Sequence, residues 1–291
     1  MLSLNNIYNI DCIDGLSQID DNSIDLIVTS PPYNVGIDYD SWNDCMPWDK
    51  YLDWCRQWLE ECYRVLKDDG RICINHYIAF SPIDFSKNTK EHICRFPLFD
   101  FREIMTKIGF NVHKIAIWED RSMKKFTAWG SWLSASSPNM QTPYEGILIG
   151  YKKQWDKINK GISTINKTEF MEGVSGIWNL GTTIGMTKAN FPETLPHMCI
   201  NLLSFYDDII LDPFSGSGTT CKVAKELGRR YIGFEISQNY CNVAWKRVNN
   251  TEWGKLEDLV IPTIKEPKTI EEAEEIEDYK KYNKFEFEGL L

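Results

Sequence analysis

One stretch of the sequence constrains the fold more than any other: DDIILDPFSGSGTTCKVAKELGRRYIGFEIS, residues 207–237. It predicts an apolar strand, a glycine-rich turn, an amphipathic helix and a second strand that ends in Glu235. Gly216 and Gly218 fall at the strand-to-helix turn, where a missing Cβ lets the backbone approach a ligand closely. A carboxylate at the end of the next strand can accept hydrogen bonds from ribose hydroxyls. The unit therefore predicts a site for an adenosyl cofactor, and the missing third glycine argues against the pyrophosphate of NAD.

A second motif, TSPPYN, follows directly after the apolar strand IDLIV near the amino terminus. Two prolines at the end of a strand cannot donate to a sheet and fix a rigid turn. The carbonyls of Ser30 and Pro31 are then expected to face the crevice at the carboxyl ends of the strands. Such acceptors can hold an amine, and Tyr33 offers an aromatic face on which a base could stack. Alternatively, the motif is an ordinary turn filled by a tyrosine.

The remaining sequence predicts one catalytic domain, residues 1–250, of mostly alternating strands and helices. The spacing of apolar residues from 49 to 66 indicates a helix, and the segments 110–120 and 144–152 resemble two further strands. We expect a small target-recognition insertion at about 121–189, where periodicity is weak. Residues 251–291 are expected to form an acidic carboxyl-terminal extension.

Composition excludes several classes of protein. No apolar run approaches the roughly 20 residues that span a bilayer, so we expect no membrane role. No secretory signal is visible, so we expect a cytoplasmic location. The nine cysteines form no C-x-x-C pair, and we expect reduced thiols and no metal site.

The formal charge of −10 argues against indiscriminate binding to nucleic acid. The segment 113–168 is nevertheless basic, with nine Lys or Arg against four Asp or Glu, and is the candidate surface for DNA. Its lysines are expected to contact phosphates and its aromatic, hydroxyl-rich loop to contact a flipped base, although a charge run is usually a solvated face and such a loop can simply be core. The candidate DNA-binding residues are Lys124, Lys125, Trp129, Trp132, Ser134, Lys152 and Lys153.

TSPPYN followed far downstream by DPFSGSGTT resembles the permuted β group of amino-methylating DNA methyltransferases. The resemblance covers roughly residues 5–250. It implies S-adenosylmethionine as cofactor and a Rossmann-like α/β methyltransferase fold, with a seven-stranded, mostly parallel sheet and helices on both faces. It assigns Ser30, Pro31, Pro32 and Tyr33 to the catalytic loop. It assigns to the cofactor site Asp11, Phe191, Thr194, Asp212, Phe214, Gly216, Gly218 and Glu235.

The resemblance further implies methyl transfer to an exocyclic amine of a base flipped out of double-stranded DNA. In this group a serine at the first position of the catalytic motif tends to accompany cytosine-N4 methylation, so Ser30 indicates cytosine-N4, with adenine-N6 as the alternative. Cytosine-C5 chemistry is disfavoured because the Pro-Cys dipeptide that typically presents its nucleophile is missing. A protein-glutamine methyltransferase would carry the two motifs in the opposite order, and a non-catalytic DNA-binding homologue would not need both. A homodimer and a cognate restriction endonuclease are compatible with the resemblance.

Overall fold

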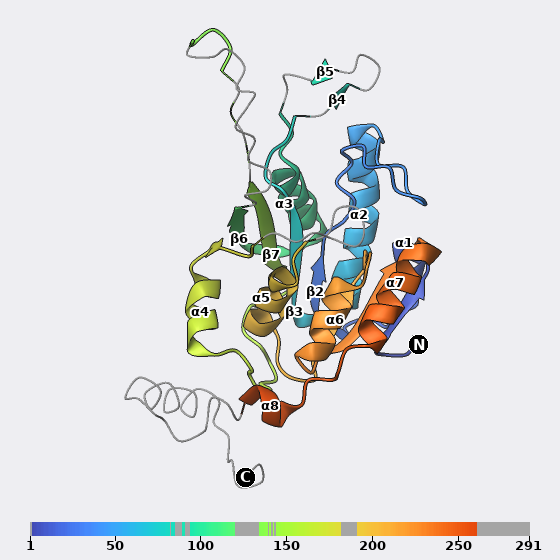
Figure 1. The fold of residues 1–291 in the computed structure, drawn as a ribbon, viewed down its shortest axis with the longest axis vertical. Coiled ribbons are helices and arrows are strands. Elements are labelled where there is room, and N and C mark those ends of the chain that lie inside the picture. Colours follow the sequence, from blue (N-terminus) through green and yellow to red (C-terminus); the bar gives the residue numbers. More distant parts are fainter. Residues whose placement is uncertain are drawn as a thin grey trace.

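The computed structural model describes residues 2–81, 83–84, 89–90, 94–119, 134–138, 140, 142, 144–181 and 191–260. These residues contain an eight-stranded sheet (Figure 1). Its strands, in spatial order, are β1 (Asn6–Asn9), β10 (Arg230–Glu235), β9 (Ile209–Asp212), β2 (Ile24–Thr29), β3 (Leu66–Tyr77), β7 (Tyr144–Tyr151), β6 (Asn111–Glu119) and β8 (Ile177–Trp178). A separate two-stranded sheet pairs β4 (Ile83–Asp84) with β5 (Thr89–Lys90).

The first five strands of this order are parallel, and β7 runs antiparallel to both β3 and β6. The predicted α/β class and mostly parallel sheet are confirmed. The predicted number of seven strands is wrong by one, because the short strand β8 pairs with the outer strand β6 over two residues. A two-residue strand leaves no periodic signal in a sequence.

Helices cover both faces of the sheet because its strands are apolar on both sides. In β2, Leu26 and Val28 face one core and Ile24 and Ile27 face the other. The first core is completed by α5 (Thr194–Leu203), α6 (Thr219–Glu226) and α7 (Gln238–Asn249), and the second by α1 (Cys12–Leu16), α2 (Trp48–Val65) and α3 (Pro97–Ile108) (Figure 1). Two further helices are α4 (Lys167–Val174) and α8 (Leu256–Val260).

Helix α2 shows how the sequence pattern specifies this packing. Its buried side chains recur at intervals of three and four residues, which places them on one face of a helix: Tyr51, Cys55, Trp58, Leu59, Cys62 and Val65. The predicted helix 49–66 is confirmed within one residue at each end. Strand β3 starts directly at Leu66, whose ψ of 140° ends the helix, and not after the Asp-Asp-Gly that follows.

The parallel strands bring distant segments to one edge of the sheet. The carboxyl ends of β1, β10, β9 and β2 point the same way, so the residues that follow them in the chain gather there. Asp11, Ser30, Pro213 and Glu235 lie on or just after these strand ends. Glu145, at the start of the antiparallel β7, joins them because it pairs with Tyr77 at the carboxyl end of β3.

The domain boundaries predicted from sequence need one correction. Strand β7 lies inside the predicted insertion 121–189, yet it pairs with β3 along seven residues and belongs to the main sheet. A single continuous insertion over 121–189 is therefore wrong. The acidic extension is described only to residue 260, where α8 lies. No helix in the described part of the chain is long and apolar enough to cross a membrane.

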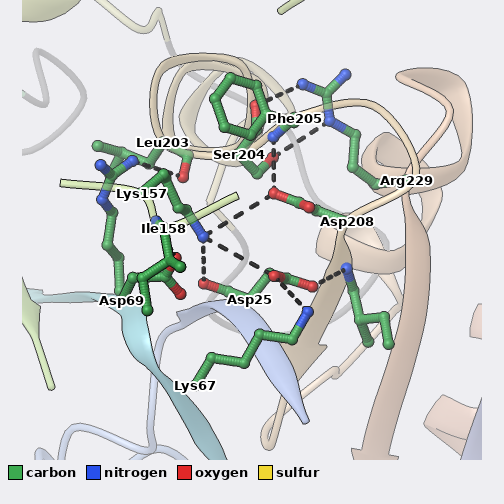
Figure 2. Close-up of polar contacts among 12 residues, drawn as sticks. Asp25, Lys67, Asp69, Lys157, Ile158, Leu203, Ser204, Phe205, Asp208 and Arg229 are labelled. Atoms are coloured by element: carbon green, nitrogen blue, oxygen red, sulfur yellow. Dashed lines mark hydrogen bonds and ion pairs between the residues drawn. The ribbon is translucent and has the colours of Figure 1, made fainter. Parts of the chain in front are cut away.

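A cluster of charges around the buried Asp25 and Lys157 lies at the opposite edge of the sheet, near the amino ends of β2 and β9 (Figure 2). The Lys157 side chain is 6% exposed, and its Nζ lies 3.9 Å from Asp25 Oδ1 and 4.0 Å from Asp208 Oδ2. Asp25 also accepts from Lys67 Nζ at 2.7 Å and from the Ile209 amide at 3.0 Å. Burial lowers the pKa of Lys157, while the two carboxylates oppose that shift. The cluster fastens the segment after β7 to the strands that carry the two sequence motifs.

We predict that Lys157→Met destabilises the fold by about 3 kcal/mol, because it removes the buried ammonium between Asp25 and Asp208 and leaves the buried Asp25 with Lys67 as its remaining cation. Lys153→Met is the matched control, since Lys153 pairs with Asp68 at 2.9 Å but is 61% exposed, and it should cost less than about 1 kcal/mol. Urea unfolding followed by circular dichroism measures both. Equal losses in the two variants would show that the buried cluster carries no special stability.

Candidate active site

The two sequence motifs are joined by one buried carboxylate. Asp212 Oδ1, at the end of β9, accepts from Thr29 Oγ1 at 2.7 Å and from the Phe214 amide at 3.1 Å. Thr29 ends β2 and immediately precedes Ser30, while Phe214 opens the glycine-rich turn. Burial raises the pKa of Asp212 to about 6. Its Oδ2 is buried and has no hydrogen-bond partner among the described residues. One side chain therefore sets the position of both loops.

A pocket opens where these loops meet. It reaches from the acidic residues after β1 and β10, past the glycine-rich turn, to the catalytic loop after β2. Residues predicted from sequence on its wall are Asp11, Ser30, Pro32, Phe191, Phe214, Gly216 and Glu235. Residues on its wall that were not predicted include Cys12, Tyr39, Asp40, Trp42, Trp54, Phe234 and Tyr240. Aromatic residues form about a third of the wall. Asp11 and Glu235 follow or end the neighbouring strands β1 and β10, whereas Ser30 follows β2, two strands further along the sheet.

The carboxylate end of the pocket is tightly built. Glu235 Oε2 accepts from the Gly216 amide at 2.9 Å, and Oε1 accepts from the Ser237 amide at 2.7 Å. Burial raises the pKa of Glu235, and these two amides act against that rise. Gly216 has φ of 52°, and a Cβ built there would meet nothing within 4 Å. Gly216 lies on the pocket wall, and a side chain at this position would enter open space there.

These features fit S-adenosylmethionine, the cofactor predicted from the sequence. Asp11 and Glu235 could provide carboxylates for a ribose and an adenine edge, and Phe214 and Phe234 could provide apolar walls. Asp11 also caps α1 by accepting from the Ile13 amide at 2.9 Å, which fixes its position.

Three residues predicted to bind the cofactor are not on the pocket wall. Gly218 has φ of 78° and a built Cβ would lie 2.9 Å from Ala244 Cβ, so its glycine lets α7 pack against the turn. Thr194 Oγ1 donates to the Leu180 carbonyl at 2.6 Å. Asp212 is 1% exposed and holds Thr29 and Phe214. The structure places these three residues in supporting positions behind the pocket wall.

The segment 34–46 lies over the pocket and is anchored at two points. Asp44 accepts from the backbone amides of residues 34–37, at 2.8 to 3.1 Å. At the other side, Asp40 Oδ2 accepts from Ser237 Oγ at 2.7 Å and from Asn239 Nδ2 at 3.2 Å. Tyr39 and Trp42 of this segment line the pocket between the two anchors.

The catalytic loop rests on a buried polar layer. Tyr33 is 9% exposed, and its ring stacks on His76 with centroids 4.0 Å apart. Tyr51 Oη donates to the Pro32 carbonyl at 2.7 Å. Burial lowers the pKa of His76 to about 3, so this imidazole is neutral. One face of Tyr33 is thus occupied by the protein, which limits the ring surface left for a base.

Asn75, His76 and Glu145 were not predicted to belong to the site. For Asn75 and His76 a signal exists, because these two polar residues follow the apolar residues 72–74 close to the carboxyl end of strand RICINHY. For Glu145 the signal is weaker: it is an acidic residue at the start of the apolar strand YEGILIGY. Only the strand register brings it to the catalytic loop.

The structure describes three of the seven predicted DNA-binding residues. Lys124, Lys125, Trp129 and Trp132 lie outside the described residues. Ser134 is exposed, and its Oγ accepts from the Ser136 amide at 3.2 Å.

The prediction for Lys152 is wrong. Lys152 is 5% exposed, and its ammonium donates to Asn22 Oδ1 and to the carbonyls of Arg64 and Leu66. It follows the carboxyl end of the antiparallel β7, at the sheet edge opposite to Ser30. Its neighbour Lys153 lies at that same edge, paired with Asp68, and so does not face the pocket either.

Comparison with known proteins identifies the family. The family model for N6 and N4 methyltransferases, described as DNA methylase, matches residues 24–246. The chain belongs to this family. The match begins at the first residue of β2 and ends within α7, so both sequence motifs lie inside it. The resemblance inferred from TSPPYN and DPFSGSGTT is confirmed.

Individual relatives of this DNA methylase agree with that assignment. The Type II methyltransferase M.MjaVI of Methanocaldococcus jannaschii is 41% identical over 175 residues, which cover 57% of this chain and 86% of the relative. The Type II methyltransferase M.BglII of Bacillus subtilis is 30% identical over 266 residues, covering 84% of this chain and 68% of the relative.

Solved structures share the fold. A putative DNA modification methylase from Thermus thermophilus, complexed with S-adenosyl-L-methionine, matches with a TM-score of 0.67 and 25% identity, covering 86% of this chain and 96% of that one. PvuII DNA methyltransferase, described as cytosine-N4-specific, matches with a TM-score of 0.64 at 18% identity, covering 98% and 94%. The predicted methyltransferase fold is confirmed.

The raised pKa of Asp212 predicts a pH dependence of stability. Because its folded pKa of about 6 exceeds its ordinary value of 3.8, the folded protein binds this proton more tightly than the unfolded chain. The contribution of this bound proton to the stability of the fold is complete below about pH 4 and is lost as pH rises through about 6. Asp212→Asn keeps an acceptor for Thr29 and Phe214 without the charge.

Without cofactor, we expect the melting temperature of Asp212→Asn to rise relative to wild type as pH increases from 4.5 to 7.5. Differential scanning calorimetry of both proteins across this range measures the difference. A difference that is independent of pH would show that Asp212 is not the titrating group.

Proposed function

We propose that this DNA methylase transfers the methyl group of S-adenosylmethionine to the exocyclic N4 of a cytosine flipped out of double-stranded DNA at a specific sequence, and that it does so in the cytoplasm. The observation that carries the proposal is the shared pocket, whose wall contains both Ser30 of the catalytic loop and Gly216 of the glycine-rich turn. A cofactor at one end and a base at the other would be within reach of each other.

The protein's own residues would hold the cofactor at the end lined by Asp11, Phe214, Gly216 and Glu235. When bound, the cofactor supplies an activated methyl group on a positively charged sulfur. Segment 34–46 would limit the access of water, since Tyr39 and Trp42 lie on the pocket wall. Excluding water strengthens each polar contact inside the site.

The catalytic loop would hold the amine. A neutral exocyclic amine is a poor nucleophile because its lone pair is delocalised into the ring. Acceptors at the Ser30 hydroxyl and the Pro31 carbonyl would favour a tetrahedral nitrogen with its lone pair available. The Tyr51 hydrogen bond to the Pro32 carbonyl keeps the loop rigid while this happens. Transfer is then direct and in line, and the main task of the protein is positioning.

Ser30 supports cytosine as the target, because a first-position serine tends to accompany cytosine-N4 methylation in the group that the sequence resembles. Stacking of the base on Tyr33 would have to use the ring face away from His76. Flipping costs a few kcal/mol, which contacts from the 121–168 region would offset, with Lys124 and Lys125 as its candidate cations because Lys152, Lys153 and Lys157 lie at the opposite edge of the sheet. A homodimer and a cognate restriction endonuclease remain part of this proposal.

Mass spectrometry of nucleosides tests the proposed reaction. Unmethylated duplex DNA of diverse sequence is incubated with the protein and methyl-labelled S-adenosylmethionine, then digested, with a reaction lacking cofactor as control. We expect labelled N4-methylcytosine. Labelled N6-methyladenine would overturn the base assignment while keeping amine chemistry. No labelled nucleoside, despite cofactor binding measured by calorimetry, would contradict DNA as the substrate.

A further inference from the structure

A continuous chain of hydrogen bonds leads from the catalytic loop into the sheet. Ser30 Oγ donates to Tyr33 Oη at 3.0 Å, and Tyr33 Oη donates to Glu145 Oε2 at 2.8 Å. Ser30 lies on the pocket wall, whereas Tyr33 is 9% and Glu145 8% exposed. The chain therefore begins at the surface that would receive the base and ends at a buried carboxylate.

Asn75 fixes the direction of this chain. Its Nδ2 donates to Tyr33 Oη at 2.7 Å and to Glu145 Oε2 at 2.7 Å. Because an amide nitrogen can only donate, Tyr33 Oη accepts from Asn75 and Ser30 and must give its own proton to Glu145. Every hydroxyl in the chain then points its hydrogen toward the carboxylate.

The neighbouring titratable groups leave Glu145 as the acceptor. Burial and the Glu145 charge raise the pKa of Tyr33, so its phenol keeps its proton and can pass one on. His76 contacts Tyr33 by stacking, and its Nε2 lies 3.3 Å from Tyr51 Oη. Burial lowers the pKa of His76 to about 3, which makes the imidazole a poor proton acceptor.

The proposed reaction needs such an acceptor. An amine that gains a methyl group becomes cationic and must lose one proton to give the neutral product. Within a closed pocket that proton needs a path, and a serine hydroxyl alone is too weak a base to keep it. We infer that Ser30, Tyr33 and Glu145 form a proton relay. For each proton that the amine releases to Ser30, Tyr33 passes one proton to Glu145. This inference rests on the proposed function.

The step balances as follows. As the bond between the amine nitrogen and the methyl carbon forms, the sulfur–methyl bond breaks and its electron pair stays on sulfur. The amine proton moves to Ser30 Oγ, the Ser30 proton moves to Tyr33 Oη, and the Tyr33 proton moves to Glu145 Oε2. The products are a neutral methylated amine, a neutral thioether and a protonated Glu145. After the base leaves, the proton returns along the same chain to water.

Two variants interrupt the relay while keeping side chains of similar size and shape. Glu145→Gln keeps an oxygen that can accept from Tyr33 but cannot take up a proton, and Tyr33→Phe keeps the ring without the hydroxyl. Single-turnover transfer of labelled methyl to DNA should fall at least about 100-fold in each. The calorimetric dissociation constant for S-adenosylmethionine should stay within about twofold of wild type. The double variant should be no slower than the slower single variant, because both interrupt one path.

A solvent isotope effect separates the relay from a structural role. Wild-type transfer should be slower in D2O than in H2O, and Glu145→Gln should lose most of that difference. Glu119→Gln is the matched control, since Glu119 ends β6 opposite Tyr144 at the same sheet edge but lies outside the relay, and it should keep the wild-type rate and isotope effect.

Two outcomes overturn the relay alone: an active wild type whose Glu145→Gln and Tyr33→Phe variants keep its rate, or a rate loss matched by an equal loss of cofactor affinity. A wild type that methylates no DNA would overturn the proposed function and the relay with it.

Discussion

The hydrogen bond between Thr29 and Asp212 is the contact on which the site depends. It joins the ends of two neighbouring parallel strands, β2 and β9, which lie 183 positions apart in the chain. One of these strands leads into the catalytic loop and the other into the glycine-rich turn, so a single buried carboxylate sets the distance between them. The raised pKa of Asp212 reflects the cost of burying that charge. A supporting polar group is retained here although it weakens the fold at neutral pH.

The two edges of the sheet use buried charge differently. At the carboxyl edge, Asp212, Glu235 and Glu145 hold loops that surround the pocket, and each accepts hydrogen bonds from groups within the site. At the amino edge, Asp25 and Asp208 surround Lys157 and fasten the chain that follows β7 (Figure 2). Strand β7 runs between the two edges: Lys157 follows its carboxyl end, and Glu145 at its amino end accepts from Tyr33.

Much of the fold could be predicted because local patterns are strong. The strand, turn and helix around Gly216 are encoded in one continuous segment, and the apolar spacing of α2 is regular. What could not be predicted depends on pairing between distant strands. Lys152 belongs to a basic run in the sequence, but the register of β7 buries it at the far edge. Glu145 enters the site for the same reason. Asp212, Gly218 and Thr194 were predicted to bind the cofactor but lie off the pocket wall, because a motif does not show whether a residue lines a pocket or supports it.

The most direct test of this account is the behaviour of two variants at opposite ends of the pocket. Ser30→Ala should bind S-adenosylmethionine within about twofold of wild type by calorimetry and transfer methyl groups to DNA at least about 100-fold more slowly. Glu235→Ala should lose cofactor affinity first, by about tenfold or more, since it removes the carboxylate that we propose binds the ribose hydroxyls. That division would establish one pocket with a cofactor end and a base end. Equal loss of cofactor binding in both variants, or full activity of Ser30→Ala, would contradict it.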